Sequence, residues 1–240
     1  MKIHYAFQSS RKLYMVMDFM PGGELFFHLK KKKRFTEEMI RFYACEIILA
    51  LECLHLHGII YRDLKPENIL VDQEGHIRLT DFGLSKQNIY EQGQDKAYTI
   101  CGTPEYVAPE IIRGCGHGKS VDWWSLGVLL YEMYCGNPPI TSSNKVEILI
   151  TIAKRGISLE REAMRNASPE FKNLMRRLLM YNCNKRLGSS EAGVEEIKSH
   201  PFFKTVDWDK VMSKKIKAPF QPEVDKDGCL LNVDKFFLKQ

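Results

Sequence analysis

Apolar and polar residues alternate along residues 2–8 and again along residues 12–19. A repeat of two residues is typical of β-strands. The pattern therefore predicts two strands joined by a turn around the polar sequence QSSRK. The sequence PGG at residues 21–23 then ends the alternation.

Apolar residues recur at helical spacing from residue 36 to Gly58. Thr36 is the expected N-cap of this helix, acidic residues occupy its first turn, and Gly58 is expected to end it. Further helices are predicted at residues 144–154, at 169–181 with Ser168 as the cap, and at 191–199.

Two β-rich runs flank residues 72–75 and predict a short hairpin. Ser120 is the expected cap of the helix VDWWSLGVLLYEMYC, which Gly136 closes. A helix that is apolar on all sides should lie buried at the centre of the fold. After Phe203 the pattern becomes an aperiodic tail rich in lysine, proline and aromatic residues.

The composition is that of a globular protein, with 44% hydrophobic residues and a net charge of +5. No apolar run reaches the ~18–20 residues that a membrane span requires. Charged and polar residues interrupt the N-terminal stretch, unlike a secretory signal. These features predict a cytoplasmic location, with the nucleus left open, and no membrane span.

Seven cysteines, an odd number without C-x-x-C spacing, indicate reduced thiols rather than a zinc or redox site. The run KKKKR at residues 30–34 is open to two interpretations, a nucleic-acid or nuclear-targeting patch and a solvated loop. Because no aromatic residues interleave it, we favour the loop and expect no nucleic-acid partner.

The candidate chemistry lies in residues 59–87, IIYRDLKPENILVDQEGHIRLTDFGLSKQ. Phosphoryl transfer requires a carboxylate to accept the proton of the attacking hydroxyl, oxygen ligands for Mg²⁺, and a cation for the moving phosphoryl group. Asp63 suits the first role, Asn68 and Asp81 the second, and Lys65 the third.

The catalytic-loop sequence is followed by Asp-Phe-Gly at residues 81–83 and Ala-Pro-Glu at 108–110, the signature of protein kinases. Together with YRDLKPEN, GTPEYVAPE, VDWWSLGVLLYEM and the tail HPFF, VDWDKV and KAPFQP, these motifs resemble the AGC group of serine/threonine kinases. The resemblance covers nearly the whole chain. It implies ATP and Mg²⁺ as cofactors.

The resemblance also implies an α+β, protein-kinase-like fold. Residues 1–20 correspond to a remnant of the N-terminal β-lobe, residues 21–203 to the helical C-terminal lobe, and residues 204–240 to an AGC-type tail. The tail segment NVDKFF is expected to reach the nucleotide pocket.

For the nucleotide, the resemblance implies that the backbone of residues 18–20, which include Asp18 and Met20, binds adenine. Met17 would be the gatekeeper and Leu70 the floor of the pocket. Glu24 would contact both the ribose and a basic substrate side chain.

For the substrate, the resemblance implies that Glu24, Glu67 and Glu132 recognise arginines that precede the target serine or threonine. A carboxylate is a natural bidentate partner for arginine, although each of the three could instead be a solvated glutamate. Pro104 and Val107 would shape the pocket for the residue after the target.

For regulation, the resemblance implies that an upstream kinase phosphorylates Thr99. A phosphate adds about −1.5 to −2 charges and needs cations nearby, and Arg62 and Lys86 match the partners in the family. Thr103 would bond the catalytic aspartate and lysine.

Two further acids are expected to be structural. Glu110 would form a buried ion pair with Arg186, and Asp122 would anchor the backbone of the catalytic loop. The sequence RGCGHGKS at residues 113–120 is not a Walker A motif, because Arg113 stands where that motif requires glycine. It predicts a flexible loop.

A kinase also needs a glycine-rich loop and a lysine that grips the phosphates, and the sequence contains no G-x-G-x-x-G. One hypothesis is that the chain is an N-terminally truncated kinase. The alternative is a non-catalytic kinase-like module that binds or regulates partners. Either way we expect weak or no activity from this chain alone, and poor solubility from its unpartnered strands.

Overall fold

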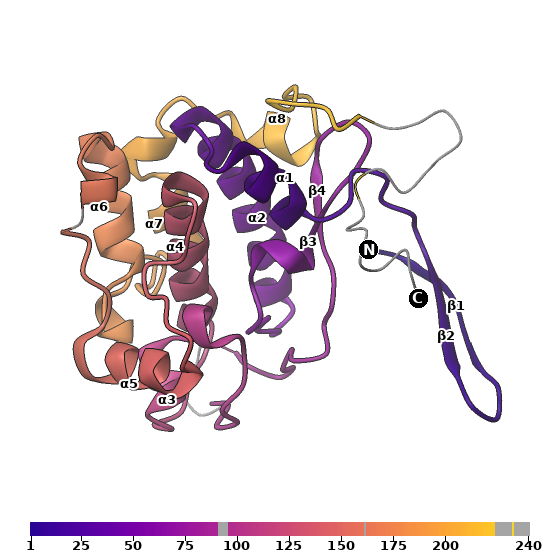
Figure 1. Cartoon of the computed structure of the whole chain (residues 1–240), viewed down its shortest axis with the longest axis horizontal. Helices are drawn as coiled ribbons and strands as arrows, with labels where there is room; N and C mark the ends of the chain where they lie inside the picture. The colour runs from indigo at the N-terminus through magenta and orange to yellow at the C-terminus, as the bar shows by residue number, and fades with distance from the viewer. Residues whose placement is uncertain (91–95, 161, 224–231, 233–240) are drawn as a thin grey trace.

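The computed structural model describes residues 1–90, 96–160, 162–223 and 232. A helical body carries a β-hairpin that projects away from it (Figure 1). The hairpin pairs β1 (Ile3–Gln8) with β2 (Leu13–Met17) in antiparallel register, as the alternating pattern predicts. Every residue of both strands is exposed, because within the described residues this sheet has two strands and nothing covers it.

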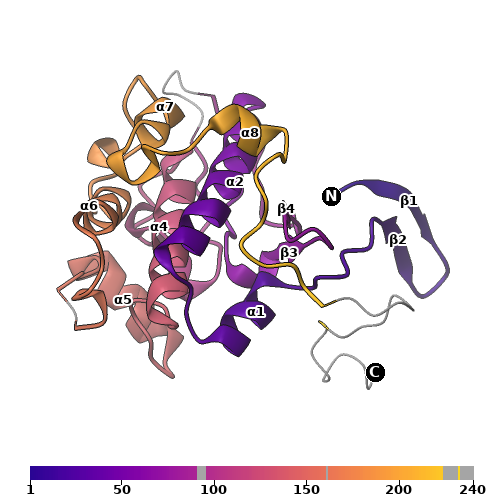
Figure 2. The same cartoon turned by 90° about the horizontal axis from the view of Figure 1, so that it is seen from above.

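The core of the body is built on α4 (Ser120–Cys135), in which all residues from 121 to 133 are buried. Both α2 (Glu37–Leu56) and α6 (Pro169–Leu178) pack against α4. Figures 1 and 2 show α2 and α4 lying side by side. This confirms the buried central helix that its uniformly apolar sequence predicts.

A second, two-stranded sheet lies beside α2 and pairs β3 (Ile69–Val71) with β4 (Ile77–Leu79). It is the predicted short hairpin. The remaining helices are α1 (Leu25–Lys32), α3 (Pro109–Ile112), α5 (Lys145–Arg155), α7 (Val194–Lys198) and α8 (Trp208–Met212). None of the helices in the described ranges combines the length and apolar character that crossing a bilayer requires.

Several predicted caps are confirmed. The hydroxyl of Thr36 accepts the N–H of Met39 at 3.3 Å, and the hydroxyl of Ser168 accepts that of Phe171 at 3.1 Å. The prediction for Ser120 is wrong: Lys119 is the N-cap residue of α4, and the Ser120 hydroxyl donates to Glu110 at 3.4 Å instead.

Three helices, α1, α3 and α8, were not predicted. The sequence KKKKR was assigned to a loop, but Lys30, Lys31 and Lys32 form the last turn of α1, where basic side chains face the negative end of the helix dipole. All five residues of the run are exposed, so the expectation that they are solvated holds. The tail described as aperiodic contains the short helix α8, capped by Asp207.

The tail returns across the body toward the hairpin (Figure 2). The ring of Phe220 lies 4.9 Å from that of His28 on α1 and 6.1 Å from that of Tyr43 on α2. Further on, the Asn232 side chain donates to the Pro21 carbonyl at 3.0 Å. The other residues of the predicted NVDKFF contact, 233–237, lie outside the described residues.

Candidate active site

Four predicted catalytic residues form one hydrogen-bonded cluster. The carboxylate of Asp63 accepts hydrogen bonds from the Thr103 hydroxyl and the Asn68 amide, both at 2.9 Å. The Lys65 ammonium lies 3.0 Å from Asp63 Oδ2 and 3.0 Å from Thr103 Oγ1. Asp63 is therefore held by three side chains, two from its own loop and one from a segment 40 residues away.

A buried side chain of α4 holds the backbone of the loop that carries Asp63. Asp122, which is fully buried, accepts the backbone N–H groups of Tyr61 at 2.9 Å and Arg62 at 2.8 Å. His55 Nε2 lies 2.7 Å from the same carboxylate. Arg62 has a positive φ of 68°, an unfavourable conformation for a residue with a side chain, which these bonds stabilise. The structural role predicted for Asp122 is confirmed.

Asp81 follows β4 and also has a positive φ, of 53°. The N–H of Gly83 donates to its Oδ1 at 3.1 Å, and its side chain is exposed. Asn68 uses its amide NH₂ to bond both the carbonyl and the carboxylate of Asp63 at 2.9 Å. This arrangement leaves Asn68 Oδ1 and Asp81 Oδ2 without hydrogen bonds among the described residues.

These oxygens fit a magnesium ion in type. Mg²⁺ is usually bound through one or two protein oxygens together with water and substrate phosphates. Among the described residues, no three His, Cys, Asp or Glu side chains lie close enough to hold a metal ion by themselves. An ion bound by Asn68 and Asp81 would therefore need water or phosphate oxygens as its other ligands. Asn68 and Asp81 would hold the ion.

The residues predicted to bind adenine connect β2 to the body. Met17 is exposed and Met20 is buried. In the segment that follows, the N–H of Gly22 donates to the Val71 carbonyl of β3 at 3.0 Å, and the N–H of Val71 donates to the Gly23 carbonyl at 2.8 Å. Leu70 forms a β-bridge with Glu24. Among the described residues, the backbone N–H of Met20 makes no backbone hydrogen bond.

Asp18 has an additional role that its sequence position did not indicate. Its carboxylate lies 2.8 Å from His4 Nε2 and 3.4 Å from Arg78 Nη1, so it links the hairpin to β4. The hydrogen bond with His4 lowers the pKa of Asp18, and the hydrogen bond from the N–H of Lys2 lowers it further. Asp18 also donates its own N–H to the Lys2 carbonyl at 3.3 Å.

Two of the predicted substrate-binding acids are close enough to interact. Burial raises the pKa of Glu132 to about 7, and the carboxylates of Glu67 and Glu105 add to this rise, while a hydrogen bond from Tyr106 opposes it. Burial also raises the pKa of Glu67, whose Oε2 is buried without a partner. Glu105 and Tyr106 were missed in the sequence, although both stand in the motif GTPEYVAPE.

Glu24 is the N-cap residue of α1 and forms a β-bridge with Leu70. Pro104 begins a 3₁₀ turn over Pro104–Tyr106, and the buried Val107 follows it. Gly102 precedes this turn with a φ of 110°. A Cβ there would lie 3.0 Å from the Arg62 carbonyl oxygen and from Val107 Cγ2, so the close approach requires glycine.

The predicted phosphorylation site, Thr99, is exposed. Arg62 donates its Nε–H to the Leu84 carbonyl at 2.7 Å, while its Nη1 is buried without a partner. Lys86 is exposed and pairs through its backbone with Ile60 at 2.9 Å. Arg62 therefore has one guanidinium nitrogen that is closed to solvent and makes no hydrogen bond.

The predicted ion pair between Glu110 and Arg186 is confirmed. Arg186 Nη1 donates to Glu110 Oε1 at 2.6 Å and Nη2 to Oε2 at 3.0 Å. Arg186 is 1% exposed and also stacks on Trp124. This pair joins the end of the segment that carries Thr99 and Thr103 to the helical core.

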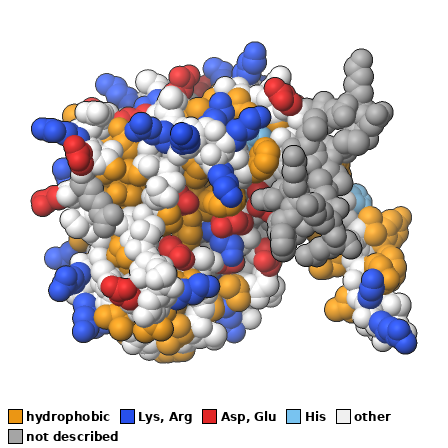
Figure 3. All heavy atoms as spheres, in the orientation of Figure 1, with side chains coloured by type: hydrophobic (Ala, Val, Ile, Leu, Met, Phe, Trp, Pro, Cys, Tyr) orange, Lys and Arg blue, Asp and Glu red, His pale blue; other side chains and the backbone are white. Residues whose placement is uncertain are grey.

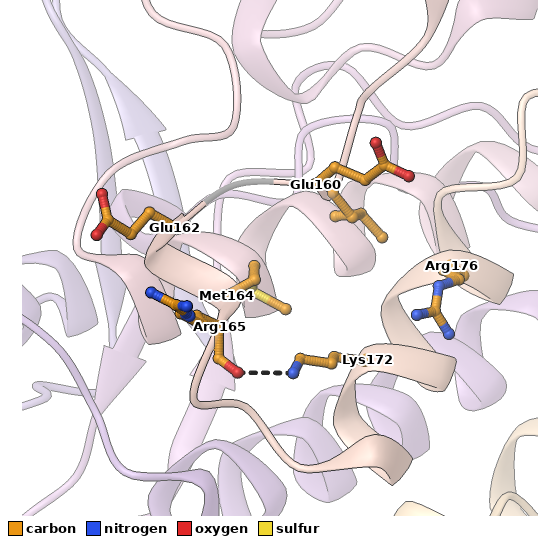
Figure 4. Close-up of a pocket in the computed structure, with 7 residues that line it drawn as sticks. Glu160, Glu162, Met164, Arg165, Lys172 and Arg176 are labelled. Atoms are coloured by element: carbon orange, nitrogen blue, oxygen red, sulfur yellow. Dashed lines mark hydrogen bonds between the residues drawn. The ribbon is translucent and has the colours of Figure 1, made fainter.

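A separate cavity of about 530 Å³ lies between the turn Glu162–Met164 and α6 (Figure 4). Lys172 Nζ donates to the Arg165 carbonyl across its floor at 2.7 Å. None of the predicted site residues line it.

Comparison with known proteins agrees with this geometry. The protein kinase domain family matches residues 1–203. The chain is 49% identical over 238 residues to "Protein kinase 2" of Dictyostelium discoideum, covering 99% of this chain and 48% of that protein. It is 48% identical over 235 residues to "Ribosomal protein S6 kinase beta" of Caenorhabditis elegans, covering 98% and 42%. It is 50% identical over 221 residues to "Ribosomal protein S6 kinase alpha-3" of Homo sapiens, covering 92% and 29%.

The chain thus spans less than half the length of these relatives. The family match covers the hydrogen-bonded cluster around Asp63, the Asp-Phe-Gly motif and the Glu110–Arg186 ion pair together. The chain therefore belongs to the protein kinase family, in the AGC group of serine/threonine kinases.

Proposed function

We propose that this chain carries the catalytic lobe of a serine/threonine kinase that transfers the γ-phosphate of ATP to protein substrates. The observation that supports this most directly is the cluster around Asp63. A carboxylate held by Thr103, Asn68 and Lys65 is oriented before the substrate binds, and such preorganisation is a main source of catalysis.

Each residue of the cluster has a role in this proposal. Asp63 orients the substrate hydroxyl and accepts its proton, and Lys65 stabilises negative charge on the transferred group. Asn68 and Asp81 hold Mg²⁺, which when bound neutralises charge on the ATP phosphates. Thr103 positions Asp63 and Lys65 relative to each other.

For the nucleotide, we propose that the backbone at residues 18–20 binds adenine, between Met17 and Leu70. Glu24 would contact the ribose. The N–H of Met20, which makes no backbone hydrogen bond with a described residue, and the half-buried side chain of Leu70 support this assignment.

For the substrate, we propose a preference for basic residues before the target. Glu67 and Glu132 support it, because an unpaired buried carboxylate oxygen and a carboxyl with a raised pKa are both stabilised by an incoming arginine. Glu24 would complete the trio, and Pro104 and Val107 would contact the residue after the target.

For regulation, we propose that an upstream kinase phosphorylates Thr99, and that Arg62 and Lys86 bind the phosphate. The unpartnered Nη1 of Arg62 supports this proposal. We also propose the division into residues 1–20, 21–203 and 204–240, and a cytoplasmic location.

The second candidate function is a non-catalytic module that binds or regulates kinase partners. One observation favours it: these 240 residues contain no G-x-G-x-x-G sequence. In kinases this sequence forms the loop that covers the ATP phosphates and helps phosphate transfer. Under this alternative the chain would bind basic peptides without phosphorylating them.

Two measurements on the purified chain test the proposal. Calorimetric titration with ATP and Mg²⁺ should show binding that Asp81→Asn abolishes. In the second measurement, the chain is incubated for a long time with radiolabelled ATP and one of three peptides, which differ only in carrying Ser, Thr or Tyr after an Arg-x-x sequence. The Ser and Thr peptides should be labelled slowly, and the Tyr peptide should not be labelled. Peptide binding without any labelling would favour the non-catalytic module.

A further inference from the structure

The basic run KKKKR, residues 30–34, has no role in the proposed kinase reaction. Its first three residues form the last turn of α1, and all five side chains are exposed. None of the five forms an ion pair with a described residue. The next acid along the chain, Glu37, instead accepts the N–H of Ser168 at 2.8 Å and its hydroxyl at 2.6 Å. The described part of the chain therefore leaves the positive charge of this run uncompensated.

Two aromatic rings hold part of the basic run in place. Lys30 Nζ lies 5.8 Å from the centroid of the Phe26 ring, and Lys32 Nζ lies 5.2 Å from that of the Phe220 ring. Phe220 belongs to the tail, and its ring also contacts that of His28 on α1 at 4.9 Å. A cation over a ring is attracted to it but keeps its charge. The basic run and this part of the tail thus form one surface.

An apolar groove of about 260 Å³ lies next to this surface, between α2 and the tail. Its apolar lining consists of Phe42, Cys45, Val206, Val211, Ile216 and Pro219. Pro219 directly precedes Phe220, and α2 begins three residues after Arg34, so both walls of the groove adjoin the basic run. The side chains of Phe42, Val206 and Ile216 are only partly buried, and the groove is therefore open to solvent.

Cations flank the groove. Arg41 and Lys217 line it, and neither forms an ion pair with a described residue. Arg41 donates its Nε–H to the Phe202 carbonyl at 2.7 Å, and its guanidinium lies 4.6 Å from the centroid of the Phe202 ring, so its position is fixed. Among the described residues that line the groove, Glu38 alone is acidic. The charge at the rim is therefore positive on balance.

The make-up of this surface favours an anionic lipid over other anionic partners. Four of the five residues in the basic run are lysine, whose ammonium is a point charge, whereas the paired recognition of one carboxylate or phosphate is typical of arginine. Clusters of four to eight Lys and Arg residues beside or on a helix are typical of binding to anionic head groups. An apolar groove with cations at its rim also fits an acyl chain that carries such a head group. An acidic peptide or a nucleic acid has no chain to fill it.

We propose that the basic run and the groove together bind the surface of an anionic membrane. Residues 30–34 attract the lipid head groups, and the groove accepts part of an acyl chain, with Arg41 and Lys217 beside its head group. Figure 3 shows Lys and Arg side chains gathered on the upper part of the body, which carries α1 and α8 in Figure 1. This surface is separate from the cluster around Asp63, and the inference goes beyond the proposed function.

The test is co-sedimentation of the whole chain with lipid vesicles, without ATP. Vesicles of phosphatidylcholine and phosphatidylserine should bind the chain, and added salt should weaken this binding, because salt screens exposed charges. Vesicles of phosphatidylcholine alone should bind it weakly or not at all. They also control for the apolar hairpin, since binding through the hairpin would not require an anionic lipid. Equal binding to the two kinds of vesicle, or binding that salt does not weaken, overturns the proposal.

Two double variants with the same net charge locate the surface. Lys31→Glu with Arg34→Glu should weaken binding to the anionic vesicles ten-fold or more. The matched control is Arg113→Glu with Lys185→Glu, two exposed residues beside α3, at the end of the body opposite α8 in Figure 1. This control should bind as the unmodified chain does. Equal losses in the two double variants overturn the proposal, because they would show that only the net charge matters.

Competition experiments test the groove and the class of partner. Dihexanoylphosphatidylserine should displace the chain from vesicles at lower concentrations than glycerophosphoserine, which has the same head group but no acyl chains. Equal displacement by the two overturns the role of the groove. Binding to a glutamate-rich peptide in solution, without binding to anionic vesicles, would identify an acidic protein segment as the partner and overturn the membrane proposal. Since no measurement involves ATP or phosphate transfer, the result is separable from any failure of the proposed kinase function.

Discussion

The hydroxyl of Thr103 lies 2.9 Å from Asp63 Oδ1, although 40 residues separate the two in the sequence. The same hydroxyl is 3.0 Å from Lys65 Nζ. The segment that bears Thr99 and Thr103 is therefore connected directly to the proposed catalytic base. A change in this segment has a direct route to the orientation of Asp63.

Thr103→Val should slow phosphate transfer to a basic serine peptide by about ten-fold or more, because valine keeps the shape of the side chain but cannot bond Asp63 or Lys65. Transfer is measured under single-turnover conditions with radiolabelled ATP. The matched control is Thr151→Val on α5, whose hydroxyl bonds only its own helix. A Thr103→Val rate equal to that of the unmodified chain contradicts this role.

Asp81→Asn should remove magnesium-dependent ATP binding, because an amide is a weaker ligand for Mg²⁺ than a carboxylate. Calorimetric titration with and without Mg²⁺ gives the measurement. Asp209→Asn, on the exposed surface of α8, is the control and should bind as the unmodified chain does. Magnesium-dependent affinity retained in Asp81→Asn would mean that the ion is held elsewhere.

Glu110→Ala should lower the free energy of unfolding by about 3–5 kcal/mol, because it leaves the buried guanidinium of Arg186 without its counter-charge. Urea denaturation is the measurement. For comparison, Arg78→Ala removes a partly exposed ion pair and should cost no more than about 1 kcal/mol. If the two substitutions lowered the free energy of unfolding by similar amounts, burial would not be what makes the Glu110–Arg186 pair important for stability.

Glu132 should make stability depend on pH. Because burial raises its pKa from 4.5 to about 7, the folded chain binds this proton more tightly than the unfolded chain does. The contribution to stability is complete below about pH 4.5 and is lost as the pH rises through about 7, by up to about 3 kcal/mol. The unmodified chain should therefore lose stability relative to Glu132→Gln over this interval.

This comparison is made by urea denaturation at a series of pH values. Glu74→Gln, at an exposed glutamate in the turn between β3 and β4, is the control and should follow the unmodified chain throughout. A constant difference between the unmodified chain and Glu132→Gln from pH 4.5 to 8 would show that Glu132 ionises normally in the folded state.

The hairpin should cause self-association. Phe7 and Met15 are 56% and 63% exposed, and Figure 3 shows hydrophobic side chains on much of the projecting hairpin, with Lys and Arg side chains toward its tip. Within the described part of the chain no third strand pairs with this hairpin, which leaves backbone groups at both edges unpaired. Sedimentation velocity should show concentration-dependent association, which the double substitution Phe7→Lys and Met15→Lys reduces. Changing the exposed Val146 and Ile150 of α5 to lysine is the control. A monodisperse monomer at high concentration would count against this expectation.

Much of the fold follows from local patterns. The β1–β2 hairpin, α2 with its Thr36 cap and the buried α4 were all predictable, because side-chain periodicity and capping are properties of neighbouring residues. The helix α1 was missed since consecutive lysines and adjacent glycines obscure its period. Packing of Leu25 and Leu29 into the core, at 0% and 3% exposure, stabilises it nonetheless.

The sequence by itself also singled out the candidate chemistry, because kinase motifs retain their order and spacing along the chain: Asp63, Lys65, Asn68 and Asp81 are all predicted from it. The contacts of Thr103 with Asp63 and Lys65 and of Glu110 with Arg186 were expected from the family resemblance, and the structure supplied their geometry. Only the tertiary structure linked Asp18 to Arg78 and gave Glu132, beside Glu67, its raised pKa. It also placed residues 116–120 of the loop against the turn at 188–191, where together they line a cavity. Burial and the distance between atoms depend on the packing of the whole chain, and no local pattern encodes them.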